Sequence, residues 1–224
     1  MIISHTQKVI FVKTRKVGGT SLEVALSAFC GEDCVITQIN EAGQALRREK
    51  GYKSAQNFEN TIWPDGYVTQ GSFYNHVAAA VIKDSIPVEI WNTYKKFSIH
   101  RNPFEAAISQ YFALKKKSPD LIFEKFVTES SHLFARNNQI APLQGEAKVD
   151  YFVRYEHYQE DLEKIGLGYL WPIFAETQIR GEDRPKTGTS VAEMFASCPA
   201  GVTAIARVCA EEISYFGYAV PEVE

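Results

Sequence analysis

Two short segments place basic, glycine and hydroxyl residues directly after an apolar run, which is a pattern that can bind anions. In the first, the run 9–12 leads into a loop over 13–19 that contains Lys16, Gly18 and Gly19. Glycines let backbone N–H groups come close to an anion, and a helix that starts there adds the positive end of its dipole. Lysine supplies a full positive charge. This segment therefore predicts a site for an anion the size of phosphate.

The order of residues in this loop differs from the phosphate-binding loop of ATPases and kinases. That pattern places its lysine after the glycines, followed by a Ser or Thr that holds magnesium. Here Lys16 comes before Gly18 and Gly19, so Thr20 is not in the usual position for magnesium. An ordinary strand–turn–helix corner, with Thr20 capping the helix and Lys16 in solvent, is the alternative interpretation.

The second segment has an arginine at the end of a predicted strand. The run 97–100 is followed by Arg101, and Pro103 is suited to the first turn of a helix that carries Ser109. An arginine in this place can bind a phosphate through two charge-assisted hydrogen bonds. The alternative is that Arg101 caps the helix or pairs with Glu105, while Ser109 faces the core.

A histidine between the two segments is a candidate general base. His76 lies where a loop leads into a predicted helix, and its ordinary pKa of about 6.5 allows it to take a proton near neutral pH. A helix-capping or half-buried histidine is the alternative. Glu59 and Asp65, in the preceding loop, are weaker candidates for the base. His100 is interpreted as structural.

Both segments resemble motifs of the sulfotransferases that use 3′-phosphoadenosine 5′-phosphosulfate (PAPS). Residues 15–21 are similar to the family's P-K-T-G-G-T-S loop, and 101–109 to its R-[DN]-P strand end with a serine about eight positions later. Arg15 stands where the family has proline and Val17 where it has threonine. The resemblance implies donor-binding roles for nine residues: Arg15, Lys16, Val17, Gly18, Gly19, Thr20, Ser21, Arg101 and Ser109.

The same resemblance implies a reaction. Lys16 would stabilise the departing 5′-phosphate, and Arg101 and Ser109 would bind the 3′-phosphate. His76, in a segment similar to H-x-x-A-x-x-I/V, would take the proton from an acceptor hydroxyl, with a carbohydrate as one candidate acceptor. The product would be adenosine 3′,5′-bisphosphate (PAP), and the reaction requires no metal. A P-loop nucleotide kinase with a degenerate loop and a non-catalytic PAPS- or PAP-binding module are the alternatives.

Strand-like and helix-like stretches alternate along the chain, which predicts an α/β fold with a largely parallel sheet. Together with the resemblance, this gives a P-loop-like three-layer fold with a central, mainly parallel sheet flanked by helices. Expected strands are 9–12, 97–100 and 151–153. Expected helices begin at Thr20 and Val77 or cover 41–50, 104–114, 155–165 and 202–216. The stretch 58–71 is expected to be a loop, as is 183–190, either a lid or a flexible surface segment, and Arg154 is read mainly as scaffold.

Composition sets limits on this interpretation. The chain has 224 residues, with 24 Lys and Arg against 27 Asp and Glu, so its net charge is −3. A nucleic-acid partner is not expected without a basic excess. No apolar run approaches the roughly 20 residues of a membrane span, and no signal peptide is recognised, so a single cytoplasmic domain covering 1–224 is expected. The four cysteines are expected to be buried thiols rather than disulfides or zinc ligands. The oligomeric state is left open.

Overall fold

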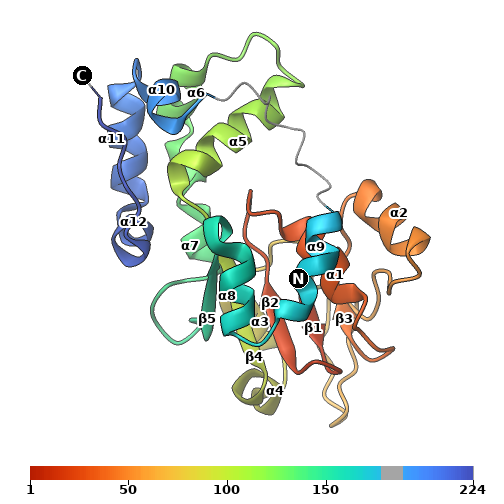
Figure 1. Cartoon of the computed structure of the whole chain (residues 1–224). Coiled ribbons are helices and arrows are strands. Elements are labelled where there is room, and N and C mark those ends of the chain that lie inside the picture. Colours follow the sequence, from red (N-terminus) through yellow and green to blue (C-terminus); the bar gives the residue numbers. More distant parts are fainter. Residues whose placement is uncertain (178–188, 224) are drawn as a thin grey trace. The chain divides into compact units, whose positions relative to one another are not determined.

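The computed structural model describes residues 1–177 and 189–223 (Figure 1). The chain divides into two compact units, each described here by itself. The first comprises Met1–His100 and Ile140–Ile179, and the second Arg101–Gln139 and Arg180–Glu224. The expectation of one domain over 1–224 stays a prediction.

A mixed sheet forms the centre of the first unit. Among the described residues it has five strands in the order β3-β1-β2-β4-β5. The strands are β1 (Ile2–Ser4), β2 (Val9–Val12), β3 (Val35–Ile36), β4 (Lys95–His100) and β5 (Tyr151–Arg154). The three strands expected from the sequence are all present, as β2, β4 and β5. An α/β architecture is therefore confirmed.

The sheet is mixed, so the expectation of a mainly parallel sheet holds only in part. Strand β2 pairs in parallel with β4, and β4 with β5, but β1 pairs antiparallel with both β2 and β3. The reason is local: only the turn 5–8 joins β1 to β2, and so short a connection can join only antiparallel neighbours. With three residues, β1 was too short for its pattern to be recognised.

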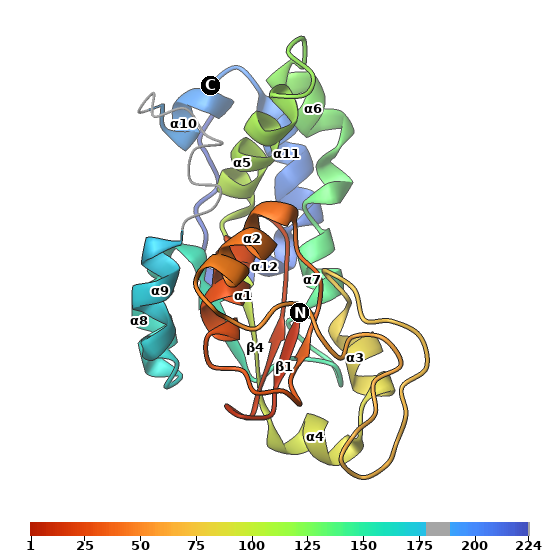
Figure 2. The ribbon, with the colours of Figure 1, turned by 90° about the vertical axis from the view of Figure 1, so that its right-hand side faces the viewer.

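Helices cover both faces of this sheet. Figure 2 places α8 and α9 on one side of the strands and α3 and α4 on the other. The helices of this unit are α1 (Gly19–Ser27), α2 (Glu41–Glu49), α3 (Ala79–Ser85), α4 (Val88–Thr93), α8 (Tyr158–Lys164) and α9 (Trp171–Glu176), with 3₁₀ turns η2 (Tyr155–His157) and η3 (Gly168–Leu170). The expected helices near 20, 41, 77 and 155 are present, with shifted ends, and 58–71 has no helix or strand.

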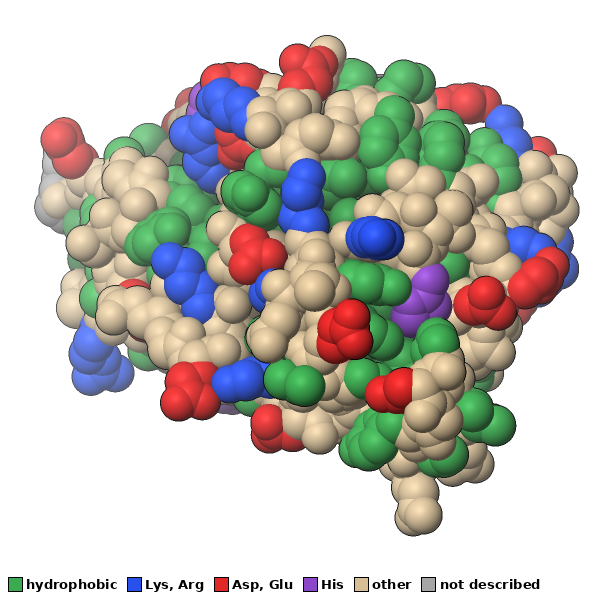
Figure 3. Space-filling view, turned by 90° about the horizontal axis from the view of Figure 1, so that it is seen from below, with side chains coloured by type: hydrophobic (Ala, Val, Ile, Leu, Met, Phe, Trp, Pro, Cys, Tyr) green, Lys and Arg blue, Asp and Glu red, His purple; other side chains and the backbone are tan. Residues whose placement is uncertain are grey.

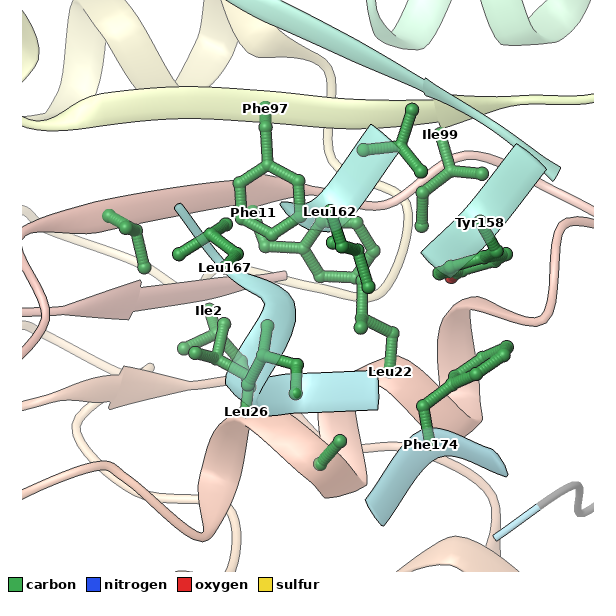
Figure 4. Close-up of a cluster of buried hydrophobic side chains, with 14 of the residues drawn as sticks. Ile2, Phe11, Leu22, Leu26, Phe97, Ile99, Tyr158, Leu162, Leu167 and Phe174 are labelled. Carbon is green, nitrogen blue, oxygen red and sulfur yellow. The ribbon is translucent and has the colours of Figure 1, made fainter. Parts of the chain in front are cut away.

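Alternating side chains of each strand supply two separate hydrophobic clusters. Ile2 and Phe11 belong to the cluster shown in Figure 4, which α1, α8 and α9 cover. Their neighbours Ile3 and Ile10 belong to the cluster on the other face. Phe11 stacks on Phe97 of the adjacent strand, with ring centroids 5.0 Å apart. This period of two decides which of the two clusters each strand side chain joins.

The second unit is helical and has its own core. Its helices are α5 (Pro103–Lys115), α6 (Phe123–Glu129), α10 (Val191–Phe195), α11 (Pro199–Val208) and α12 (Ala210–Phe216), with the turn η1 (Ser131–Leu133); α7 (Arg136–Ile140) ends in the first unit. Phe195 lies at the centre, edge-on to Phe104 and to Phe123. The single helix expected over 202–216 is wrong: the backbone leaves helical geometry at Cys209, where no glycine or proline signals a break.

Two further expectations can be compared with the described residues. All four cysteines are buried thiols, as expected. Among the described residues, no helix is both long and apolar enough to cross a membrane. On the face shown in Figure 3, basic and acidic side chains are interspersed with hydrophobic ones rather than gathered by sign.

Candidate functional site

The first corner, residues 13–22, is the turn from β2 into α1. Its backbone takes left-handed conformations at Lys16 (φ 60°) and Gly18 (φ 69°), on either side of the buried Val17. A non-glycine residue rarely adopts such a φ, because its Cβ is crowded there. Closely spaced left-handed residues at a helix start belong to the class of backbone shapes that make concave anion sites.

Both glycines of this corner are required by their surroundings. A methyl group at Gly19 would lie 2.9 Å from Cγ of Lys13, so the lysine side chain packs directly on the glycine backbone. At Gly18 the positive φ is the main constraint, and an added methyl would also meet the rings of Phe174 and Tyr155 at 3.4–3.5 Å. Close backbone packing thus explains the glycine pair without any ligand.

Val17 and Ser21 face inward rather than into the loop. Val17 is fully buried in the cluster beneath α1, where the family has a threonine hydroxyl. The Ser21 hydroxyl donates to the main-chain carbonyl of Thr177 at 2.7 Å, which joins α1 to the end of α9. The side chains of Val17 and Ser21 therefore anchor the corner. Anion contacts expected from these two positions would have to come from the backbone N–H groups.

Lys13 also belongs to this corner, although its residue type alone does not single it out. It is 3% exposed, and its ammonium lies 2.6 Å from Oε2 of Glu23 and donates to the Thr20 hydroxyl at 3.1 Å. Glu23 is fully buried and also contacts the amino group of Met1. Burial alone would raise the pKa of Glu23, but the Met1 amino group and Lys13 outweigh it and hold that pKa at about 2.

His76 is attached to the same corner. Its Nδ1 lies 3.1 Å from the main-chain carbonyl oxygen of Lys13, and its backbone is left-handed at φ 65°. A carbonyl can only accept, so this contact assigns the proton to Nδ1 and leaves Nε2 with its lone pair. Burial, followed by the charges of Lys13 and Arg15, lowers the pKa of His76 to about 4 despite the hydrogen bond. His76 is therefore neutral at pH 7.

The second corner, residues 101–109, leads from the end of β4 into α5. Asn102 caps the helix by accepting a hydrogen bond from the N–H of Phe104 at 2.9 Å, and Pro103 occupies the first helical turn as expected. Arg101 pairs with Glu105, Nη2 to Oε2, at 3.1 Å. This is the pairing named as the alternative for Arg101. Ser109 is half-buried one turn beyond Glu105, on the same face of α5, because residues four apart share a face.

The remaining candidates fall into clear groups. Glu59 and Asp65 are exposed in the loop 58–71. His100 is buried edge-on to Phe152, and burial lowers its pKa to about 4, which fits a structural role. Arg154 forms a two-point pair with Asp161, at 2.8 Å for both contacts, as expected for scaffold.

The predicted loop 183–190 lies mostly outside the described residues. Positions 183–188, including both of its cations, are not described. Ser190 is described, and it forms a capping box with Glu193 at the start of α10.

Comparisons with known proteins do not identify a relative. No family model, curated protein or solved structure matches this chain. Support for a function therefore comes from the two corners and from the sequence resemblance.

The first corner brings together a loop suited to anions and a candidate base. A glycine-containing loop leads into a helix start, Lys16 is part of that loop, and a neutral histidine is oriented by the carbonyl of Lys13. Such an arrangement can hold an anionic group and accept a proton from a nearby hydroxyl.

Proposed function

We propose that this protein is a PAPS-dependent sulfotransferase that moves the sulfuryl group to a hydroxyl acceptor, with a carbohydrate as one candidate. The observation that carries the proposal is the hydrogen bond between His76 and the Lys13 carbonyl. It attaches the candidate base to the loop that the resemblance assigns to the 5′-phosphosulfate. His76 is thus attached to the corner that contains Lys16.

In the proposed reaction the acceptor oxygen forms a bond to sulfur while the bond from sulfur to the 5′-phosphate oxygen breaks. Nε2 of His76 accepts the hydroxyl proton, and PAP leaves with the bridging oxygen. Lys16 and the backbone N–H groups of the loop stabilise the charge that develops on that oxygen, and such preorganised charge is usually the largest contribution to catalysis. Positioning of the two substrates supplies much of the remainder.

The resemblance alone assigns the 3′-phosphate to Arg101 and Ser109. The pair between Arg101 and Glu105 bears on that assignment, since a carboxylate already occupies part of the guanidinium. Binding of a 3′-phosphate would require Arg101 to share its donors or to exchange Glu105 for the phosphate. The proposal also includes the finer fold prediction, a P-loop-like three-layer arrangement, and the cytoplasmic location.

Nucleotide binding tests the donor directly. Calorimetry and thermal unfolding should be compared for adenosine 3′,5′-bisphosphate, AMP and magnesium ATP. At 100 times its dissociation constant, a ligand stabilises the folded protein by about 2.7 kcal/mol, and we expect this for the bisphosphate. Stabilisation by magnesium ATP alone would instead indicate a kinase.

Turnover separates an enzyme from a binding module. Protein that binds the bisphosphate should be incubated with PAPS and panels of saccharide and phenol acceptors, and PAP release measured. Release that depends on an acceptor supports the proposal. Normal binding with no release on any acceptor would favour the non-catalytic module.

A further inference from the structure

Lys13 contacts both the candidate base, His76, and the start of helix α1. Its main-chain carbonyl accepts the hydrogen bond from His76, while its ammonium donates to Thr20 and pairs with Glu23. Its alkyl chain lies against Gly19, 2.9 Å from the position of an added methyl. Lys13 therefore contacts the candidate base through its backbone and the start of α1 through its side chain.

We propose that Lys13 is a positioning residue that joins the general base to the anion-binding loop. The inference rests on the proposed function only for the identity of the anion and of the reaction. Within it, the carbonyl of Lys13 sets the orientation of His76, and the buried ammonium sets the position of Thr20 at the start of α1.

The carbonyl contact gives His76 a defined direction. With the proton on Nδ1, Nε2 is the atom that can receive a proton from an acceptor. The left-handed backbone of His76 is unfavourable for a residue with a side chain. Such conformations persist where the surroundings determine them, and they cluster at functional sites.

The Lys13 ammonium connects the loop to helix α1 through Thr20 and Glu23. Lys13 and Glu23 are both buried, so removal of either side chain would leave the other charge buried with less compensation. Glu23 lies on α1, four residues after Gly19, and Thr20 lies between them. The pair therefore connects the end of β2 to the first turns of the helix whose N-terminus faces the loop.

The charges around His76 connect loop occupancy to basicity. Burial opposes protonation of its imidazole most strongly, and the cations of Lys13 and Arg15 add to this, whereas the hydrogen bond to the Lys13 carbonyl favours protonation. An anion bound in the loop offsets these cations. His76 should then become more basic, so that proton transfer is favoured when the donor is present.

The test uses charge-neutral substitutions in the full chain. Lys13→Met alone leaves Glu23 buried with less compensation and could unfold the protein, whereas Lys13→Met/Glu23→Gln removes both charges, which is often tolerated. Lys96→Met is the matched control, because Lys96 is also a buried lysine with a carboxylate partner, Asp150 at 3.0 Å, at the other end of the sheet.

Two readouts are measured on folded protein. NMR titration of the His76 imidazole should give a higher pKa in the double variant than in the wild type, because a nearby cation is lost, and an unchanged pKa in Lys96→Met. Calorimetry should give about tenfold weaker binding of adenosine 3′,5′-bisphosphate in the double variant, as expected for the loss of a hydrogen bond to a charged group that holds the loop. An unchanged His76 pKa and unchanged affinity would overturn the proposal.

Two measurements on the wild type need no variant. Nitrogen NMR at neutral pH should identify the proton on Nδ1, and a proton on Nε2 would overturn the assigned contact. Addition of adenosine 3′,5′-bisphosphate or of inorganic phosphate should raise the His76 pKa, and no rise with bound anion would contradict the coupling. If the bisphosphate does not bind the wild type, the proposed function fails, while the tautomer and the double variant still test Lys13.

Discussion

The two corners have the same outline in sequence but differ in how their cations are held. In the first corner the buried carboxylate Glu23 pairs with Lys13, which lies in the scaffold, and Lys16 belongs to the loop itself. In the second corner Arg101, the cation expected to bind a phosphate, is itself paired with Glu105. In the first corner the carboxylate of Glu23 pairs with Lys13, a different lysine from the one expected to bind the anion. In the second corner the carboxylate of Glu105 pairs with Arg101, the residue expected to bind the phosphate.

The availability of a motif cation therefore depends on the carboxylate beside it. A buried ion pair costs desolvation energy, and removal of one partner leaves an uncompensated charge. Lys13 and Glu23 compensate each other's charge, so the first corner can fold before any anion binds. Arg101 would gain a phosphate only by sharing or exchanging Glu105, which weakens the assignment of the 3′-phosphate to Arg101.

The largest effect is expected from Lys16→Ala at the first corner. Loss of the charge that stabilises the departing phosphate should slow sulfuryl transfer about 10²–10³-fold. Lys8→Ala is the matched control, because Lys8 also has a left-handed backbone, at φ 51°, and lies exposed in the turn between β1 and β2. Acceptor-dependent PAP release from both variants measures this, and equal small losses would remove Lys16 from the mechanism.

A smaller effect is expected from Arg101→Ala at the second corner. A charge-assisted contact to a phosphate is worth about 1.5–3 kcal/mol, so affinity for adenosine 3′,5′-bisphosphate should fall about 10–100-fold. Affinity for AMP, which lacks the 3′-phosphate, should change little. Arg154→Ala is the control, since Arg154 also ends a strand and pairs with an aspartate. Calorimetry that finds the same loss for AMP would make Arg101 structural.

The sequence predicted the fold where elements are long and patterned. Strands β2, β4 and β5 and the start of α5 at Pro103 follow from apolar runs and from helix-start chemistry. The hairpin of β1 could not be predicted from three residues, and with it the antiparallel half of the sheet was missed. The break at Cys209 was missed because backbone geometry, not residue type, marks it.

For the site, the sequence selected the loop and His76 but not the residue that joins them. Lys13 follows directly after a buried strand, where a lysine is most simply read as solvated. Its role depends on Glu23, ten positions later, and on a main-chain carbonyl, which carries no residue-type signal. A lysine at a strand end with an acid in the next helix is the signal that could have indicated a buried pair.

The two units each contain a buried glutamate, and the pKa values of the two are shifted in opposite directions. Burial raises the pKa of Glu212 in the second unit to about 7, whereas the Met1 amino group and Lys13 outweigh burial and lower that of Glu23 in the first unit to about 2. The contribution of Glu23 is complete above its unfolded pKa of about 4.5 and is lost as pH falls towards 2. Stability of the second unit should fall, by about 2 kcal/mol, as pH rises from 4.5 through 7 and Glu212 must ionise.

Substitution at each site separates the two trends. Glu212→Gln should remove the fall in stability between pH 5 and 8. Glu23→Gln should leave that fall in place and weaken the dependence of stability on pH below about 4.5. Denaturant unfolding of both variants across pH 3–8 measures the two slopes. A pH dependence that is unchanged in Glu212→Gln would show that another group titrates.

The smallest effect is expected from Glu105→Gln at the second corner. Glu105→Gln keeps the side-chain shape but removes the charge that pairs with Arg101, and these side chains are 25% and 11% exposed. If Glu105 competes with the 3′-phosphate, affinity for adenosine 3′,5′-bisphosphate should rise about threefold to fivefold, consistent with a partly exposed ion pair worth up to about 1 kcal/mol. Affinity for AMP should stay constant. A loss of affinity instead would mean that Glu105 holds Arg101 in its binding orientation, and the carboxylate would then serve the second corner as Glu23 serves the first.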